Sequence, residues 1–250
     1  MVMLGVVPMK IGILTDIHNN VIALDAVLQE FESQNCAKIV CAGDIIGIGP
    51  YPEETVQKMM SIPNLIAVRG NHEKYLLEGM PSKYPNDEGM GYDEMEYHKW
   101  EHQCLSPSSI EFLRKLPYRV DFCELGKKIS VMHYCMNQKN QCINYTPNPT
   151  ESNLLELFPE RNQDIVIYGH DHTRMICHSQ NRWFINSGSL GCPANDKNIA
   201  RAAILEIEEN NHISVRSVEI KYDVTKVVEY IDWIKYPASG EIKKFFFGVN

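Results

Sequence analysis

The sequence contains no apolar run long enough to cross a bilayer, no excess of positive charge and no closely spaced pair of cysteines. The first absence argues against a membrane protein, since a spanning helix needs about 20 mostly apolar residues. The first ten residues also lack the charged start and the small-residue cleavage site of a secretion signal. The formal net charge of −8 argues against sequence-independent binding of nucleic acid, which needs a basic face.

The eight cysteines are scattered along the chain, and none belongs to a CxxC motif. A disulfide framework is typical of shorter secreted proteins, whereas isolated cysteines commonly serve as small buried apolar residues. We therefore expect reduced thiols and a cytoplasmic protein.

What the chain does contain is the composition of an ordinary globular protein, with 250 residues, 44% hydrophobic and 22% charged. This length fits about one large domain, and we find no repeat or low-complexity tract in it. We expect a single domain over residues 1–250, with a core at about 10–220, a helical insertion at about 73–116, and a C-terminal helix and tail at about 223–250. No role is assigned to residues 1–9.

Short apolar runs rich in β-branched residues alternate with segments of helical periodicity in the first seventy residues. Strands are predicted at 10–16, 38–44 and 64–71, and helices at 20–31 and 52–60 lie between them. This order indicates βαβ units and a mainly parallel or mixed sheet. The second half predicts a buried strand, three hairpins and a helix, at residues 164–170, 118–134, 173–189, 201–220 and 224–234.

Polar side chains follow the predicted strands at the points where the strands end. In open α/β sheets, ligands bind outside the carboxyl ends of the strands, so we expect these side chains to meet. Carboxylates, imidazoles and an amide without thiolate suit Mn²⁺, Fe, Co²⁺, Ni²⁺ or Zn²⁺ better than Ca²⁺ or a structural cysteine–zinc site. The residues are Asp16, His18, Asp44, Asn71, His72, His133, His170 and His172.

Two features of the spacing predict how these side chains are presented. The motifs DIH and HDH place two ligands at i and i+2, and an extended backbone would turn both to one side. Gly43, Gly70 and Gly169 immediately precede ligands, where glycine permits sharp turns and close approach of the backbone.

The ordered motifs DIH, GDIIG, GNHE, a later single histidine and GHDH resemble those of the calcineurin-like metallophosphoesterase superfamily. The segments GDIIGIGP and INSGSLGCP make the chain most similar to its small prokaryotic, phosphodiesterase-like members, and the resemblance runs from about Lys10 to Glu208. It implies an α/β fold, a four-layer α/β/β/α sandwich of two mixed sheets flanked by helices.

The resemblance also implies roles for the strand-terminal residues. Asp16, His18 and His172 would hold one divalent ion, and Asn71, His133 and His170 a second, with Asp44 bridging the two. The ions would be Mn and/or Fe, with Zn, Ni or Co as alternatives. A metal-bridged hydroxide would attack a phosphate ester in line, and His72 would protonate the leaving group as general acid.

The chain departs from the family pattern within its motifs. Asn19 stands where glycine often follows the histidine, so it must tolerate that turn. Asp171 stands where threonine is common, and is interpreted either as solvated or as tuning a neighbouring imidazole. Glu73 replaces an aspartate. Tyr134 replaces a glycine next to His133 and could reshape the rim of the site.

Other candidates allow two interpretations each. Glu73, His98 and His102 could form a third metal site, but a solvated helix face is favoured for the two histidines. Arg201, like Asn71 and His72, could bind substrate phosphate, or it could form a surface salt bridge. The segment SGSLG could bind an anion or be a structural loop. Aromatic residues that could stack on a substrate, with packing as the favoured alternative, are Tyr51, Trp100, Tyr134 and Tyr145.

The expected function is hydrolysis of phosphate esters, with phosphodiesters or nucleotide-type substrates favoured and monoesters and phosphoproteins as alternatives. One competing hypothesis is a non-catalytic metal-binding scaffold that retains the fold. The other is a nuclease using the same centre, for which Lys127–Lys128 and Lys243–Lys244 form only a thin basic track. Partners are expected to be small phosphate esters or nucleotides rather than nucleic acid or membrane. The oligomeric state stays open.

Overall fold

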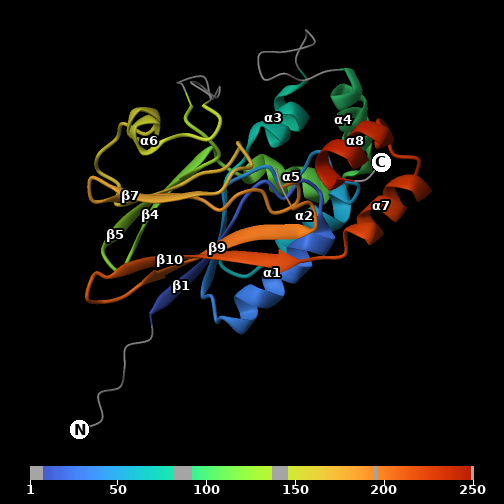
Figure 1. Cartoon of the computed structure of the whole chain (residues 1–250). Coiled ribbons are helices and arrows are strands. Elements are labelled where there is room, and N and C mark those ends of the chain that lie inside the picture. Colours follow the sequence, from blue (N-terminus) through green and yellow to red (C-terminus); the bar gives the residue numbers. More distant parts are fainter. Residues whose placement is uncertain (1–7, 81–91, 137–145, 194–195, 249–250) are drawn as a thin grey trace.

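The computed structural model describes residues 8–80, 92–136, 146–193 and 196–248 of the chain. Within these ranges the protein forms two five-stranded mixed β-sheets with helices on their outer faces (Figure 1). The predicted α/β sandwich is therefore confirmed. Residues 81–91 of the predicted helical insertion and the candidate Tyr145 lie outside the described residues.

The first sheet has the strand order β10-β9-β1-β2-β3. Strands β1, β2 and β3 are parallel, as the βαβ pattern predicts, while β9 and β10 form an antiparallel hairpin added beside β1. The strands are β1 (Met9–Leu14), β2 (Lys38–Cys41), β3 (Leu65–Ala67), β9 (Ile199–Ile207) and β10 (Ile213–Lys221).

The second sheet has the order β4-β5-β6-β8-β7. Its three central strands are parallel, and the hairpin partners β4 and β7 run antiparallel at the two edges. The strands are β4 (Arg119–Glu124), β5 (Lys127–Met132), β6 (Ile165–Ile167), β7 (Met175–Ser179) and β8 (Arg182–Asn186).

Side chains alternate along the central strands between two separate cores, because successive residues of a strand point to opposite faces. In β1, Ile11 and Ile13 join the core between the two sheets, and Leu14 joins the core beneath the helices. The helix that follows β1 lies so close that a Cβ atom on Gly12 would come within 2.5 Å of the Phe31 ring. Both faces of this sheet are therefore buried.

The helices are unequally divided between the two outer faces. Helix α6 (Glu151–Leu157) packs on the second sheet through Leu154 and Leu157, which share a cluster with Phe184. The first sheet is covered by helices that follow its strands and by the insertion between β3 and β4 (Figure 1). These helices are α1 (Val21–Ser33), α2 (Pro52–Met60), α3 (Asn71–Glu78), α4 (Tyr92–Cys104), α5 (Pro107–Lys115), α7 (Val224–Trp233) and α8 (Ser239–Phe247).

Two predicted elements differ from the structure. The third strand ends at Ala67, and Asn71 begins helix α3 rather than ending a strand. The C-terminal tail contains a further helix, α8, which packs against α4 and the loop that carries Ile48.

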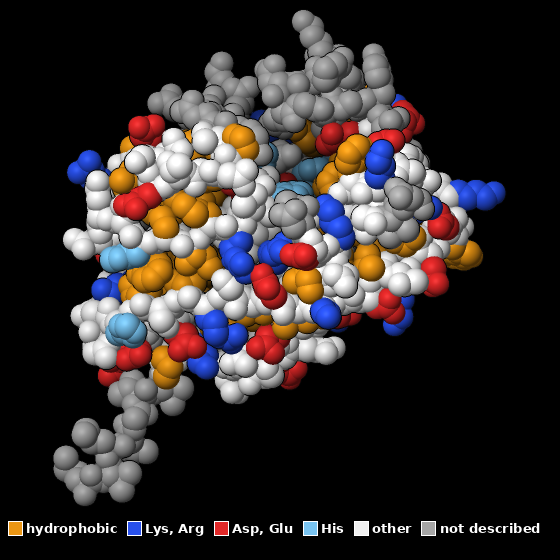
Figure 2. Space-filling view, in the orientation of Figure 1, with side chains coloured by type: hydrophobic (Ala, Val, Ile, Leu, Met, Phe, Trp, Pro, Cys, Tyr) orange, Lys and Arg blue, Asp and Glu red, His pale blue; other side chains and the backbone are white. Residues whose placement is uncertain are grey.

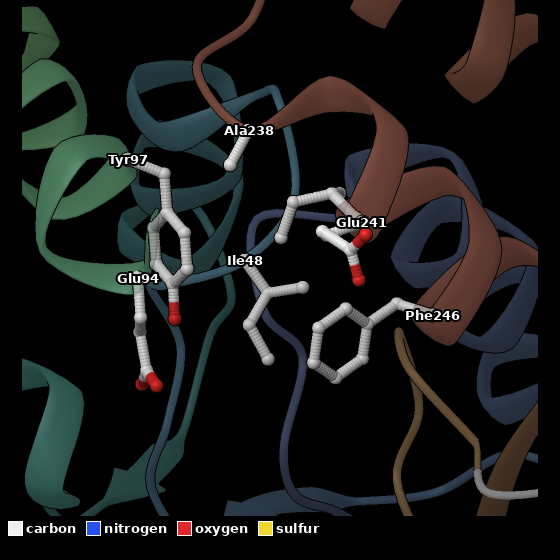
Figure 3. A pocket seen from close by; sticks show the side chains of 7 residues that line it. Ile48, Glu94, Tyr97, Ala238, Glu241 and Phe246 are labelled. Atoms are coloured by element: carbon white, nitrogen blue, oxygen red, sulfur yellow. The ribbon is translucent and has the colours of Figure 1, made fainter. Parts of the chain in front are cut away.

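None of the helices in the described ranges combines the length and the apolar character needed to cross a bilayer. The pocket between α4 and α8 is lined by Ile48, Glu94, Tyr97, Ala238, Glu241 and Phe246 (Figure 3).

Candidate metal centre

The metal-ligand candidates lie where strands of both sheets end. Asp16 follows β1, Asp44 follows β2, His133 follows β5, and the GHDH segment follows β6. Histidine side chains gather in a hollow on the face shown in Figure 2. The ligand loops are not extended, which corrects the expectation for DIH and HDH. Their residues with positive φ are Asp16, His18, Asn19, Asp44, His170 and His172, at 51°, 49°, 52°, 53°, 79° and 57°.

The left-handed backbone conformation is energetically unfavourable for residues other than glycine. Residues in this conformation cluster at functional sites, where the surrounding structure holds them in place. Asn19 takes the left-handed turn that the sequence requires of it, because asparagine tolerates this conformation better than most residues. The glycines beside the ligands serve close contacts. A Cβ atom on Gly70 would lie 2.1 Å from Asp44 Oδ1, and one on Gly169 would lie 2.0 Å from Thr15 Oγ1.

One group of donors consists of Asp16, His18 and His172, whose ligand atoms lie within 4.8 Å of one another. His18 Nε2 is 2.9 Å from His172 Nε2, and the two nitrogens are 3.9 and 3.7 Å from Asp16 Oδ1. Asp16 and His18 are fully buried. The backbone N–H of His170 donates to both carboxylate oxygens of Asp16 at 3.1 Å, which fixes the carboxylate beside the second loop.

A second group consists of Asp44, His133 and His170, again within 4.8 Å. Asn71 Oδ1 lies between the two imidazoles, 3.1 Å from His133 Nε2 and 3.1 Å from His170 Nδ1. Asp44 Oδ2 is 3.1 Å from His133 Nε2 and 3.9 Å from His18 Nε2, so this oxygen faces both groups. The two histidines of GHDH therefore belong to different groups.

The tautomers of His18 and His172 are those expected if a cation binds between the two rings. His18 Nδ1 lies 3.2 Å from Ile46 O, and His172 Nδ1 lies 3.0 Å from Cys192 O. A carbonyl oxygen only accepts, so each Nδ1 carries the proton and donates. Both Nε2 atoms then present lone pairs to each other. A divalent cation would turn this repulsion into coordination, and backbone acceptors on the opposite nitrogen are typical of metal-binding histidines.

The charges in the centre are strongly coupled. Burial lowers the pKa of His18 well below its usual range and that of His170 to about 3, so both imidazoles are neutral at neutral pH. Burial acts against charge at His133 too, but Asp44 outweighs it and raises the pKa of His133 to about 10. His133 Nδ1 also donates to Ala42 O at 2.7 Å. His133 is thus an imidazolium paired with Asp44 when no cation is bound.

His72 lies beside both groups. Its backbone N–H donates to Asp44 Oδ1 at 3.1 Å, and its Nε2 is 3.8 Å from Asp44 Oδ2. Gly47 leaves room for the ring, since a Cβ atom there would lie 2.1 Å from His72 Nδ1. Burial lowers the pKa of His72 to about 4, despite the opposing effect of Asp44. Protonation at neutral pH therefore requires an additional negative charge nearby, such as a phosphate group.

Glu73 does not join His98 and His102, which corrects the expected composition of a third metal site. Its two carboxylate oxygens accept hydrogen bonds from four backbone N–H groups of the GDIIG and GNHE loops. The donors are the backbone nitrogens of Asp44, Ile45, Ile46 and Gly70, at 3.1, 2.8, 3.1 and 2.6 Å. Burial and Asp44 raise the pKa of Glu73 to about 7, although these backbone bonds act in the opposite direction.

The helical histidines have different neighbours from those expected. His98 is fully buried, so the solvated-face interpretation is wrong for it. His98 and His102 are grouped with Glu101, and His98 also with His72 and Glu94. Sequence analysis missed Glu101. Its Oε2 accepts from the Asn19 side chain and, at 2.6 Å, from Gly47 N. The spacing of HKWEH, which places this glutamate on the histidine face, was the available signal.

The SGSLG segment is a structural loop in which the backbone N–H groups of residues 188–191 already have acceptors. Leu190 N donates to Thr15 O, and Gly191 N donates to Asp16 O. The side chain of Ser189 donates to Asp16 O at 2.8 Å and accepts from Cys192 N. The loop thereby clamps the backbone of the first ligand motif.

Arg201 and Asp171 are also held by protein groups. Arg201 forms ion pairs with Asp196 at 3.0 Å and with Glu219 at 3.6 Å, which agrees with the salt-bridge interpretation. Asp171 is buried, which excludes the solvated interpretation, and its Oδ1 accepts from the side chain of Asn186 at 2.7 Å and from Thr173 N.

The aromatic candidates serve packing. The ring of Tyr51 stacks on Tyr230 with centroids 4.4 Å apart, and Trp100 meets Tyr236 edge-on at 4.8 Å. Tyr134 is completely buried, and its hydroxyl accepts from Thr146 N. The seven cysteines in the described ranges are free thiols.

Comparison with known proteins places this fold and site in one family. Residues 9–210 match the calcineurin-like phosphoesterase superfamily domain. The chain therefore belongs to the calcineurin-like phosphoesterases, and the predicted membership is confirmed. Phosphoester hydrolysis dependent on divalent metal ions is the general activity of this family.

Individual proteins are similar over almost their whole length. An uncharacterised protein of Methanocaldococcus jannaschii is 27% identical over 243 residues, covering 88% of this chain and 91% of that protein. A hypothetical protein of Pyrococcus horikoshii has a TM-score of 0.80 at 19% identity, covering 96% and 98% of the two chains. A metallophosphoesterase from Sphaerobacter thermophilus has a TM-score of 0.74 at 22% identity, covering 96% and 99%. The two structures show that the fold is shared.

Proposed function

We propose that this protein is a dinuclear-metal phosphoesterase that acts on phosphodiesters or nucleotide-type substrates. The observation that carries the proposal is the position of Asp44 Oδ2, which faces imidazoles of two separate donor groups at once. A single carboxylate oxygen between two His-rich groups suits a pair of cations, because it can neutralise part of the charge of each.

The proposed ligands of the first ion are Asp16, His18 and His172, and those of the second are Asn71, His133 and His170, with Asp44 shared. This donor set contains only oxygen and nitrogen atoms, which suits Mn²⁺ or Fe, with Zn²⁺, Ni²⁺ or Co²⁺ as alternatives. Carbonyl acceptors on the Nδ1 atoms of His18, His133 and His172 hold these rings with Nε2 toward the centre.

Bound cations would activate water and neutralise the oxygens of a phosphate ester. The protein itself would supply the positions of the reacting groups. Asp44 fixes His72 through its backbone N–H, and Gly47 leaves the space that the His72 ring occupies. A phosphate ester beside His72 would raise the pKa of the imidazole, which could then donate its proton to the leaving-group oxygen.

The proposed substrates are small. The chain carries a net charge of −8, so an extended polyanion would meet little general attraction. Arg201 is already paired with two carboxylates, Asp196 and Glu219, which neutralise its charge. Phosphate recognition therefore rests on the cations, Asn71 and His72 in this proposal.

A direct test measures hydrolysis of bis(p-nitrophenyl) phosphate and p-nitrophenyl phosphate by protein reloaded with Mn²⁺. His72→Ala should lower kcat by roughly 10²–10⁴-fold while metal content stays unchanged, the range of a lost general acid. His212→Ala, at an exposed turn, is the matched control and should retain activity. Equal turnover by wild type and His72→Ala, with intact metal loading, would favour a metal-binding scaffold.

Cleavage of single-stranded RNA or DNA with a steep dependence on salt would instead support a nuclease. A panel of nucleoside monophosphates, cyclic nucleotides and dinucleoside polyphosphates would then rank the substrate classes by kcat/KM.

A further inference from the structure

Helix α4 presents three potential metal ligands on one side. His98, Glu101 and His102 occupy positions i, i+3 and i+4, which lie on the same helix face. His98 and Glu101 are fully buried, and the side chain of His102 is 20% exposed, so one edge of the group reaches the surface. The three ligand atoms lie within 4.8 Å of one another.

The buried polar atoms in this group lack hydrogen-bond partners within the described part of the chain. These atoms are Nδ1 and Nε2 of His98, Oε1 of Glu101 and Nε2 of His102. His98 Nδ1 is 3.5 Å and His102 Nε2 is 3.7 Å from Glu101 Oε1, distances at which the atoms face one another without hydrogen-bond geometry. Unsatisfied buried polar groups destabilise a folded protein, so several of them at one point indicate that a ligand binds there.

We propose that His98, Glu101 and His102 bind a third divalent cation, of the zinc type, separate from the paired centre. Two imidazoles and one carboxylate are a common donor set for Zn²⁺ and related ions, and they leave a coordination position for water. A cation at this point satisfies His98 Nδ1, Glu101 Oε1 and His102 Nε2 together, whereas a single proton satisfies one pair at most.

The site connects the helical insertion to the paired centre. The second oxygen of Glu101 accepts from the Asn19 side chain and from Gly47 N. These residues lie on the loops that carry His18 and Asp44. The His98 ring is 4.9 Å from the His72 ring. A cation on Glu101 Oε1 therefore fixes α4 against the ligand loops and behind His72, and its role is to position them.

Metal stoichiometry tests the site without any assay of activity. The protein is stripped with a chelator, reloaded with Zn²⁺, desalted and analysed for zinc per chain by mass spectrometry. His102→Ala should hold one zinc ion fewer than wild type, and the matched control His212→Ala should hold as many as wild type. Equal zinc in wild type and folded His102→Ala overturns the proposal.

A second variant separates this site from the paired centre. His18→Ala combined with His172→Ala removes two donors of the first group, and adding His102→Ala to it should remove one further zinc ion. If the double variant binds no zinc that depends on His102, the third site is wrong whatever the paired centre does. Should His102→Ala fail to fold, anomalous scattering at the zinc edge from zinc-soaked wild-type crystals decides. A peak between His98 and His102 supports the site, and its absence refutes it.

Discussion

The Nε2 atoms of His18 and His172 lie 2.9 Å apart, although 154 positions separate the two residues in the chain. The opposite nitrogen of each ring donates to a backbone carbonyl, so the facing atoms carry lone pairs. Carbonyl oxygens of the surrounding loops hold the two rings in this arrangement. The stability of the protein should therefore respond to the cation that relieves the repulsion.

Removal of metal should lower the melting temperature. A ligand present at 100 times its Kd stabilises the folded state by about 2.7 kcal/mol. For a protein of this size a shift of several degrees is expected when Mn²⁺ or Zn²⁺ is added to chelator-treated protein. Differential scanning calorimetry measures it. His18→Ala should lose the part of the increment that comes from the first ion, and a full increment in that variant would contradict the assignment of His18 as a ligand.

Metal binding should release protons at neutral pH. Attraction to Asp44 outweighs burial and raises the pKa of His133 to about 10, so the metal-free protein holds this proton at pH 7–9. A ligand imidazole must be neutral, and about one proton per chain should therefore leave His133 on loading. Calorimetric titrations in buffers of different ionisation enthalpy count the protons. The same count in His133→Asn would show that the proton comes from elsewhere.

The same ion pair predicts how the metal-free protein responds to pH. The pKa of His133 is higher in the folded state than the usual 6.5, so the pair contributes its full stability below about pH 6.5. That contribution is lost as the pH rises toward about 10. Urea unfolding of chelator-treated protein between pH 6 and 10 should show the decline, and His133→Asn should show a smaller one.

Replacing Glu73 by glutamine should destabilise the protein strongly. The carboxylate accepts from four backbone N–H groups, and an amide oxygen leaves those facing the NH₂ without an acceptor. Each orphaned donor costs about 1–3 kcal/mol, so a loss of at least about 2 kcal/mol in the free energy of unfolding is expected. Glu96→Gln, at an exposed ion pair with Lys99, is the control and should cost less than about 1 kcal/mol.

Adding a methyl group at Gly47 should impair catalysis more than folding. Its Cβ atom would lie 2.1 Å from His72 Nδ1, which forces the ring to move. Displacement of a reacting group by about 1 Å costs up to 10²-fold in rate. Gly79→Ala introduces a similar backbone strain, since φ is +101° there and +95° at Gly47, but its new Cβ atom meets nothing within 4 Å in the described structure. Equal kcat/KM in the two variants would contradict the placement of His72.

The alternation of apolar strands and polar termini was sufficient to predict a mainly parallel or mixed sheet and the convergence of the ligand loops, whereas the two-sheet sandwich followed from the family resemblance. Motifs such as GHDH are local and each follows a strand. The sheet brings the carboxyl ends of its parallel strands together, so the motifs meet whatever the detailed conformation of their loops. The backbone conformation of Asp16 and His170 was not predictable, because their positive φ angles are imposed by contacts with distant loops. The periodicity of apolar residues carries no information about such backbone strain.

Long-range polar contacts were the other feature that could not be predicted from the sequence. Glu73 and Glu101 each accept hydrogen bonds from backbone groups of loops 27 or more positions away, and no pattern of spacing reveals those partners. The short helix α8 follows the same principle, because burial of Ile242 and Phe247 in the core beneath the helices stabilises a segment that was predicted only as a tail. Tertiary packing decides such elements.

The most direct test of the paired centre is a crystal structure of manganese-loaded protein with anomalous data at the manganese edge. Two peaks about 3.5–4 Å apart are predicted, one among Asp16, His18 and His172 and one among Asn71, His133 and His170, with Asp44 contacting both. A single peak, or ions bound away from these seven side chains, would contradict it.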